Sequence, residues 1–134
     1  METEFPASPE LLAEVERLGN EFFAAFYERA LLSRPDDEQV LEELAHALTR
    51  AGRHAEGLRV DRRLAALRPD DPTVLYNLAC SLSLSGQLEE ALAAINAAIE
   101  AGFEDAALLA NDDDLAALRL DPRFRRLLDP TTHA

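Results

Sequence analysis

The chain has 134 residues, enough for one domain, and a composition rich in leucine and alanine with only 6% aromatic residues, which favours an all-helical fold. Its net charge of −13, from 26 acidic and 13 basic residues, disfavours nucleic acid and anionic membranes as partners. The single cysteine excludes an internal disulfide and a cluster of thiolate metal ligands.

The cellular location is predicted from two further patterns. No apolar run approaches the roughly 18 residues that a membrane-spanning helix needs. The chain begins Met-Glu-Thr-Glu, whereas a secretory signal begins with basic residues followed by an apolar run. We therefore expect a cytoplasmic protein with no membrane association.

The first predicted element is a long helix within residues 8–34. Ser8 is a suitable N-cap, and Pro9 fits the first helical position. Four of the eight aromatic residues of the chain lie in this helix: Phe22, Phe23, Phe26 and Tyr27. The first and third share one helix face, and the second and fourth share the neighbouring face. Core packing is the favoured interpretation of this cluster, and a homodimer interface is the alternative.

A repeat follows, because residues 35–68 match residues 69–102 without a gap when the chain is shifted by 34 positions. Eleven of the 34 positions are identical, where about three are expected by chance. In the first unit the identical residues are Pro35, Asp36, Asp37, Val40, Leu41, Leu44, Ala45, Leu48, Gly52, Glu56 and Leu58.

Each unit of the repeat predicts two helices. The Pro-Asp-Asp sequence ends the preceding helix and supplies capping carboxylates to the next one. Gly52 and Gly86 stand where the first helix must end in a left-handed residue. The second helices are expected at about His54 to Leu67 and about Gln87 to Ala101.

These units resemble tetratricopeptide repeats, which have a 34-residue period, Leu-Ala in the first helix, Gly in the turn, Ala in the second helix and Pro at its end. The segment VLYNLACSLSLSGQLEEALAAINAAIEAG follows that pattern. The earlier unit departs from it at Asp61, where the next unit has Ile95. The resemblance implies a right-handed α-solenoid of antiparallel helix hairpins, forming a single domain over residues 1–134.

The resemblance extends more weakly to the flanks of the two repeats. Residues 8–34 look like an N-terminal helix that includes part of a preceding repeat. Downstream, Leu109 still matches Leu75, but Asp112 stands where Leu78 was, and the repeat breaks there. Within residues 103–129, the segment NDDDLAALRLDPRFRRLL resembles the closing segment that follows the last repeat in many bacterial members of the family. We expect residues 103–129 to form capping helices, since a repeat array must cover its open end.

Candidate catalytic and metal-binding residues are few. The acidic run at Asp112–Asp114 lacks the alternation, the Gly and the final Glu of a calcium-binding loop, and is interpreted as charge near a helix N-terminus. His46 and Cys80 occupy equivalent places in the two units, but two ligands do not make a zinc site and no partner for a Cys–His nucleophile is evident. We therefore expect no enzyme activity, no cofactor and no bound metal.

The resemblance also implies a binding surface, because the first helices of tetratricopeptide arrays line a concave groove that holds a segment of a partner. Carried over to this chain, the groove residues are Gln39, Glu42, Glu43, His46, Thr49, Arg50, Thr73, Tyr76, Asn77, Cys80, Ser83 and Leu84. All of them lie off the apolar stripe of their helices, so we expect them in solvent.

The sequence thus predicts an adaptor that binds a neutral-to-basic segment of another protein or peptide in this groove. The alternative is a structural subunit that associates with itself, as a homodimer formed through the aromatic N-terminal helix.

Overall fold

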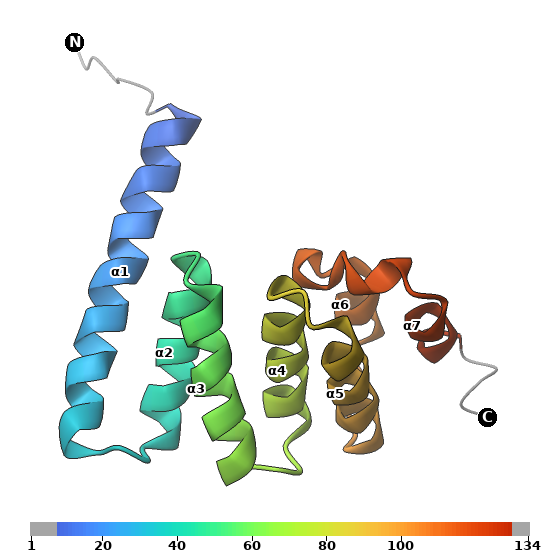
Figure 1. The fold of residues 1–134 in the computed structure, drawn as a ribbon. Helices are drawn as coiled ribbons and strands as arrows, with labels where there is room; N and C mark the ends of the chain where they lie inside the picture. Colours follow the sequence, from blue (N-terminus) through green and yellow to red (C-terminus); the bar gives the residue numbers. More distant parts are fainter. Residues whose placement is uncertain (1–7, 130–134) are drawn as a thin grey trace.

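The computed structural model describes residues 8–129, and it is all-helical over that range, with no strand (Figure 1). The helices are α1 Pro9–Ser33, α2 Glu38–Arg50, α3 His54–Leu67, α4 Pro72–Leu84, α5 Leu88–Glu100, α6 Ala106–Asn111, η1 Asp113–Leu115, η2 Leu118–Leu120 and α7 Pro122–Leu127. The acidic first residues of the chain, used above to predict its location, lie outside the described residues.

The repeat of the sequence is also a repeat of helices. The bounds of α2 and α4 are offset by one period of the repeat at both ends, and the starts of α3 and α5 are offset by the same period. Gly52 and Gly86 both have positive φ, at 81° and 75°, so the predicted left-handed turn residues are confirmed. The capping carboxylates are confirmed as well, because Asp37 and Asp71 each accept a hydrogen bond from the backbone three residues on.

Helices that follow one another in the chain pack against one another, from α1 through α5 (Figure 1). The largest core lies between α4, α5 and the C-terminal elements, where Ile95, Leu115, Leu118 and Phe124 are completely buried. Residues 103–129 thus cover the face that α5 would otherwise expose. Smaller clusters lie between α1 and α2 and between α2, α3 and α4.

The long helix α1 starts as predicted, with the Ser8 hydroxyl accepting a hydrogen bond from the Leu11 backbone at 3.1 Å. It packs on α2 through an inner face made of Asn20, Ala24, Tyr27 and Leu31, of which Ala24 is completely buried. Only the C-terminal part of α1 has this support, because α1 extends well beyond the end of α2 (Figure 1).

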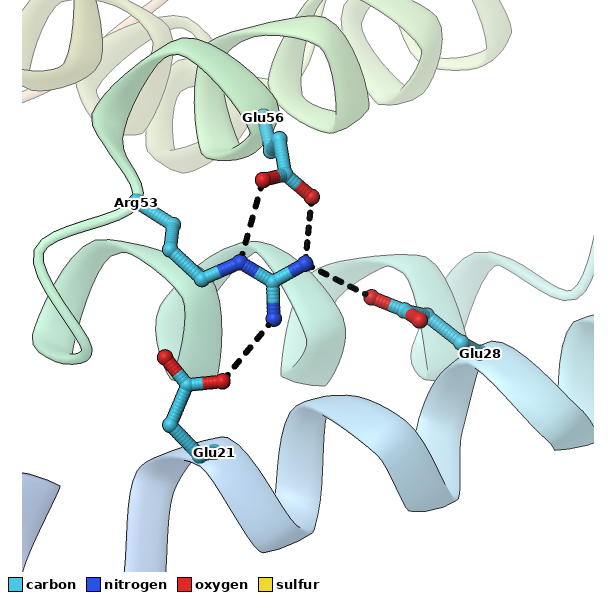
Figure 2. Close-up of polar contacts among 4 residues, drawn as sticks. All are labelled: Glu21, Glu28, Arg53 and Glu56. Atoms are coloured by element: carbon cyan, nitrogen blue, oxygen red, sulfur yellow. Dashed lines mark hydrogen bonds and ion pairs between the residues drawn. The ribbon is translucent and has the colours of Figure 1, made fainter. Parts of the chain in front are cut away.

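An ion-pair network ties α1 to the start of α3 (Figure 2). The Arg53 guanidinium donates hydrogen bonds to Glu21 at 3.1 Å and to Glu28 at 3.4 Å, both on α1. On its other side it pairs with Glu56 of α3 through two nitrogens. Hydrogen bonding to Glu56, with the charges of all three glutamates, raises the pKa of Arg53 despite its partial burial. Arg53 therefore joins two helices that share little apolar contact.

The prediction of core packing is wrong for three of the four aromatic residues of α1. Phe22, Phe23 and Phe26 are 67%, 50% and 58% exposed, and only Tyr27 is partly buried against α2. The physical reason is that, among the described elements, α1 packs closely on α2 alone, so only one of its faces is covered. Rings on the other faces meet solvent.

The core between α4 and α5 gives a direct test of the packing. Leu82 is 2% exposed, so replacing it with Ala removes buried methyl groups and leaves a cavity, which we expect to lower the free energy of unfolding by about 2–5 kcal/mol. Urea denaturation followed by circular dichroism measures the change. Leu120 is 79% exposed, and Leu120→Ala is expected to stay within about 0.5 kcal/mol of the wild type. Equal losses for the two variants would contradict the packing.

Candidate functional site

Two adjoining hollows lie along α2. The first, of about 160 Å³, lies between α1 and α2 and is lined by Asn20, Phe23, Tyr27, Glu43, His46, Ala47 and Arg50. The second, of about 190 Å³, lies between α2, α3, α4 and the segment around η1. Its lining is His46, Thr49, Arg50, Asp61, Tyr76, Asn77, Cys80, Ser81, Asp112 and Asp114. His46 and Arg50 belong to both linings, so the two hollows meet on α2.

Seven of the twelve groove residues expected from the sequence line these hollows: Glu43, His46, Thr49, Arg50, Tyr76, Asn77 and Cys80. On α2 they follow a spacing of three and four residues, which places them on one helix face. The other five, Gln39, Glu42, Thr73, Ser83 and Leu84, line neither hollow. The structure thus brings together the C-terminal half of the α2 set with the middle of the α4 set.

The expectation that the groove residues lie in solvent is wrong for Tyr76, Cys80 and Ser83, which are 5%, 7% and 4% exposed. These residues are spaced by four and three on one face of α4, and η1 packs on α4. The Tyr76 ring stacks on Phe103, with ring centroids 4.4 Å apart, and its hydroxyl donates a hydrogen bond to Asp112. The closing segment therefore covers a helix face that the repeat pattern alone leaves open.

The wall of the second hollow formed by α4 and η1 contains three groups with a raised pKa: Cys80, Tyr76 and Asp114. Burial raises the pKa of the Cys80 thiol, and the neighbouring Asp112 carboxylate raises it further. Burial, followed by the hydrogen bond to Asp112, raises the pKa of the Tyr76 hydroxyl. The pKa of Asp114 is also raised, first by burial and then by Asp112. Cys80 is therefore a protonated thiol at neutral pH, which is a poor nucleophile.

The same wall holds the one group of potential metal ligands found among the described residues. Donor atoms of Cys80, Asp112 and Asp114 lie within 4.8 Å of one another. However, Asp112 already accepts the Tyr76 hydroxyl and the Asp114 backbone N–H, the latter at 3.0 Å, which caps η1. These bonds give the carboxylate a structural role without a cation. The absence of a bound metal, expected from the sequence, stays a prediction.

Asp61 is a buried carboxyl at the floor of the second hollow. It is 4% exposed, and the Ser81 hydroxyl of α4 donates a hydrogen bond to it. Burial raises its pKa from 3.8 to about 6, with a smaller upward contribution from Glu42, while the Ser81 bond and His46 act in the opposite direction. Ile95, at the equivalent position of the second unit, is completely buried. At this position the first unit therefore differs from the second by placing a polar side chain inside the core.

The sequence reasoning missed several lining residues, namely Asn20, Phe23, Tyr27, Asp61, Ser81, Asp112 and Asp114. Two of them carried a signal. Asp61 is charged where the second unit is apolar, and Ser81 is polar where the first unit has Ala47. A polar pair that replaces two apolar repeat positions predicts a buried hydrogen bond between adjacent helices. Asp112 gave no comparable signal, because its position depends on how the closing segment folds back.

Comparisons with known proteins give no family for this chain. No family model, no curated protein and no solved structure matches it. Among the described residues, no helix has the length and apolar character needed to cross a membrane.

The burial of Asp61 predicts a pH-dependent stability. Between pH 3.8 and about 6 the folded chain keeps a proton that the unfolded chain has lost, so the contribution of Asp61 to stability falls as the pH rises through this window. Above this window Asp61 is ionised while buried, and this buried charge lowers the free energy of unfolding. We expect Asp61→Asn to raise the free energy of unfolding there by roughly 1–3 kcal/mol, since one pKa unit corresponds to about 1.4 kcal/mol.

Urea denaturation of both proteins on each side of the window measures this effect. The two unfolding free energies should approach one another below pH 3.8, where Asp61 is protonated in both states. Ser81→Ala provides a control, because it removes the hydrogen bond and keeps the carboxyl group, and should lower stability above the window. A gap between wild type and Asp61→Asn that does not change with pH would contradict the assignment.

Proposed function

We propose that this protein is a tetratricopeptide-like interaction module that binds a neutral-to-basic segment of another protein along α2. The observation that carries the proposal is that the two hollows meet at His46 and Arg50. Together they offer a path across α2 from α1 to the η1 segment. A path of this kind suits an extended peptide better than a compact small molecule, because it is open and elongated rather than a single enclosed cavity.

The helix arrangement supports the family resemblance. The tetratricopeptide pattern has hairpins offset by one repeat period with Gly in the turn of each, and this chain has two such hairpins with left-handed glycines at the same place. A capping aspartate also starts the first helix of each hairpin. Gly57 also fits, because a Cβ at this position would lie 2.8 Å from the Thr49 side chain of α2. The tight hairpin between α2 and α3 thus depends on a small residue, as in the family pattern.

The chemistry of the lining suits a neutral or basic segment. Glu43 stands in the first hollow, and Asp112 and Asp114 stand in the second, so carboxylates are available to Arg or Lys side chains at both ends of the path. Asn77 can bond to a peptide backbone with its amide. Within residues 8–129, Asn20 Nδ2 is buried without a hydrogen-bond partner, which leaves it able to donate to a ligand after a small rearrangement.

Arg50 is the exception in this acidic lining. It lies where the hollows meet, and it is a donor only, so it can bond a carbonyl oxygen, a carboxylate or an aromatic face of the ligand. It would repel a lysine placed directly over it. The preferred segment is therefore one with basic residues near its ends and a neutral centre.

Catalysis is not part of this proposal. The acceptor of the Cys80 thiol is the Asp112 carboxylate at 4.0 Å, which already accepts the Tyr76 hydroxyl and which raises the pKa of the thiol instead of producing a thiolate. His46 lies in the same lining as Cys80, but among residues 8–129 no hydrogen bond joins it to a hydroxyl or a thiol. Binding, without a cofactor, is the function that the lining supports best.

Selection of displayed peptides tests the proposal before any partner has been identified. We expect the wild-type protein to enrich peptides with basic ends and to leave an acidic library of equal size unenriched. For a selected peptide, His46→Ala should weaken binding by about 1–2 kcal/mol, because His46 lies where the hollows meet. Glu43→Gln should weaken binding by less than about 1 kcal/mol, because an exposed charge pair contributes little.

Arg59→Ala is the matched control for these variants. Arg59 is exposed and lines a different hollow, between α1 and α3, so its loss should leave the affinity unchanged. Circular dichroism checks that each variant folds. Tyr76 is not a suitable test position, because its buried stacking and hydrogen bond make it part of the fold. Binding that survives His46→Ala and weakens with Arg59→Ala would contradict the proposed groove.

A further inference from the structure

Helix α1 has a second apolar face, opposite the inner face that packs on α2. We call it the outer stripe, and it consists of Leu11, Val15, Leu18, Phe22 and Phe26. With about 100° of rotation per residue, these side chains lie roughly half a turn round the helix from the inner face. Each of them is between 54% and 67% exposed. A helix that is apolar on two opposite faces is typical of an element buried between two partners.

The charges of α1 avoid the outer stripe. All five glutamates of the helix, at positions 10, 14, 16, 21 and 28, lie on the flanks or towards the α3 side. The one charged residue in line with the stripe is Arg29, which forms no ion pair with any residue in the range 8–129. In a chain with a net charge of −13, a long helix face without an acid is the surface on which two copies can meet with least repulsion.

The N-terminal part of α1 needs support that the rest of the described chain does not give. Every residue from Pro9 to Leu18 is exposed, so this part of the helix has no tertiary packing. Isolated helices shorter than about 12–15 residues are only marginally stable in water. A partner along the outer stripe would bury Leu11, Val15 and Leu18 and hold this overhang in the helical form.

We infer that the outer stripe is the interface of a homodimer, in which α1 packs along α1 of a second copy. From the exposed fractions, the stripe and the adjacent Leu12 offer roughly 600 Å² of apolar surface per copy, most of the ~800 Å² per partner that a stable interface buries. A single stripe that runs along one helix can meet its own copy about a two-fold axis, which needs no second complementary surface.

Side-chain size and the helix dipoles favour an antiparallel arrangement of the two helices. The middle of the stripe is Leu18, so an antiparallel pair places Phe22 and Phe26 opposite Val15 and Leu11 of the second copy. Large rings then face smaller side chains. The same register sets the two helix dipoles antiparallel, which is their favourable side-by-side orientation. A parallel pair would instead bring the equivalent acidic flanks together.

This interface is separate from the proposed groove. Phe23 and Tyr27, on the neighbouring face of α1, line the first hollow, whereas Phe22 and Phe26 do not. A homodimer formed through the outer stripe therefore leaves both hollows open, so the dimer and the peptide-binding function can fail independently.

Analytical ultracentrifugation of the full chain over a wide range of concentrations tests the dimer. We expect the wild type to approach twice its chain mass of 14.8 kDa, with little dependence on salt because the interface is apolar. The double variant Leu18→Glu, Phe22→Glu places four carboxylates at the centre of the interface and should sediment as a monomer. Leu120→Glu is the matched control, since it puts the same charge on an exposed leucine at the other end of the chain, and it should remain dimeric.

Three results would overturn the inference: a wild type that stays monomeric at the highest concentration, a double variant that still dimerises, or a control that dissociates as readily as the double variant. Circular dichroism must show that the double variant keeps the helices of the wild type. If it loses them, the single variant Val15→Ser, which adds no charge, is used instead, and it should weaken the dimer by at least tenfold. A wild type that is monomeric alone but pairs with an unrelated apolar helix would also overturn the homodimer.

The antiparallel arrangement is tested by cysteine cross-linking, with the wild type, whose Cys80 is buried, as the background. Val15→Cys combined with Phe22→Cys should give a disulfide-linked dimer under oxidation, and Val15→Cys alone should not, because position 15 faces position 22 of the second copy in the antiparallel register. A linked dimer from Val15→Cys alone would overturn that register. Binding of a selected peptide by each variant should stay within twofold of the wild type, which separates this outcome from a failure of the groove.

Discussion

The packing of the inner face of α1 on α2, supported by the pairing of one guanidinium with three carboxylates at the start of α3, determines where the first helix of the molecule lies. Arg53 bonds Glu21 and Glu28, which are seven residues apart and therefore on the same side of α1, and Glu56 orients the guanidinium from α3. Because the inner face of α1 lies on α2 and its glutamates pair with Arg53, its aromatic flank borders the first hollow and its outer stripe is turned away. Both proposed surfaces follow from this placement.

Features set by neighbouring residues could be predicted from the sequence. The capping role of Ser8 and Asp37, the positive φ of Gly52 and Gly86 and the ends of α3 all depend on a few residues along the chain, and the structure has them where the sequence placed them. The α2 residues of the candidate groove came from the tetratricopeptide resemblance, and four of the six line the hollows, whereas Gln39 and Glu42 do not. Helical periodicity alone places Glu43, His46 and Arg50 on one face, whatever packs around them.

Features set by distant segments could not be predicted in this way. The burial of Tyr76 and Cys80 depends on Phe103 and Asp112, which lie in the closing segment beyond the second unit, and no local pattern tells which face of α4 that segment covers. Phe22 and Phe26 are exposed because no described helix packs on their face of α1. Their pattern is that of a buried stripe, and whether a neighbour exists to bury it depends on the number of helices that surround α1.

The covering of α4 by the closing segment gives the molecule an internal reporter of its own local unfolding. Cys80 is the only cysteine of the chain, and it lies beneath the Tyr76–Asp112 hydrogen bond, with its thiol protonated. Cys80 lines the second hollow but is only 7% exposed, so an alkylating reagent reacts slowly with it while η1 stays on α4, and the thiolate that reacts forms readily only when η1 separates. The rate of alkylation, compared with that of a free thiol, therefore measures the free energy needed to open this one contact while the rest of the core stays folded.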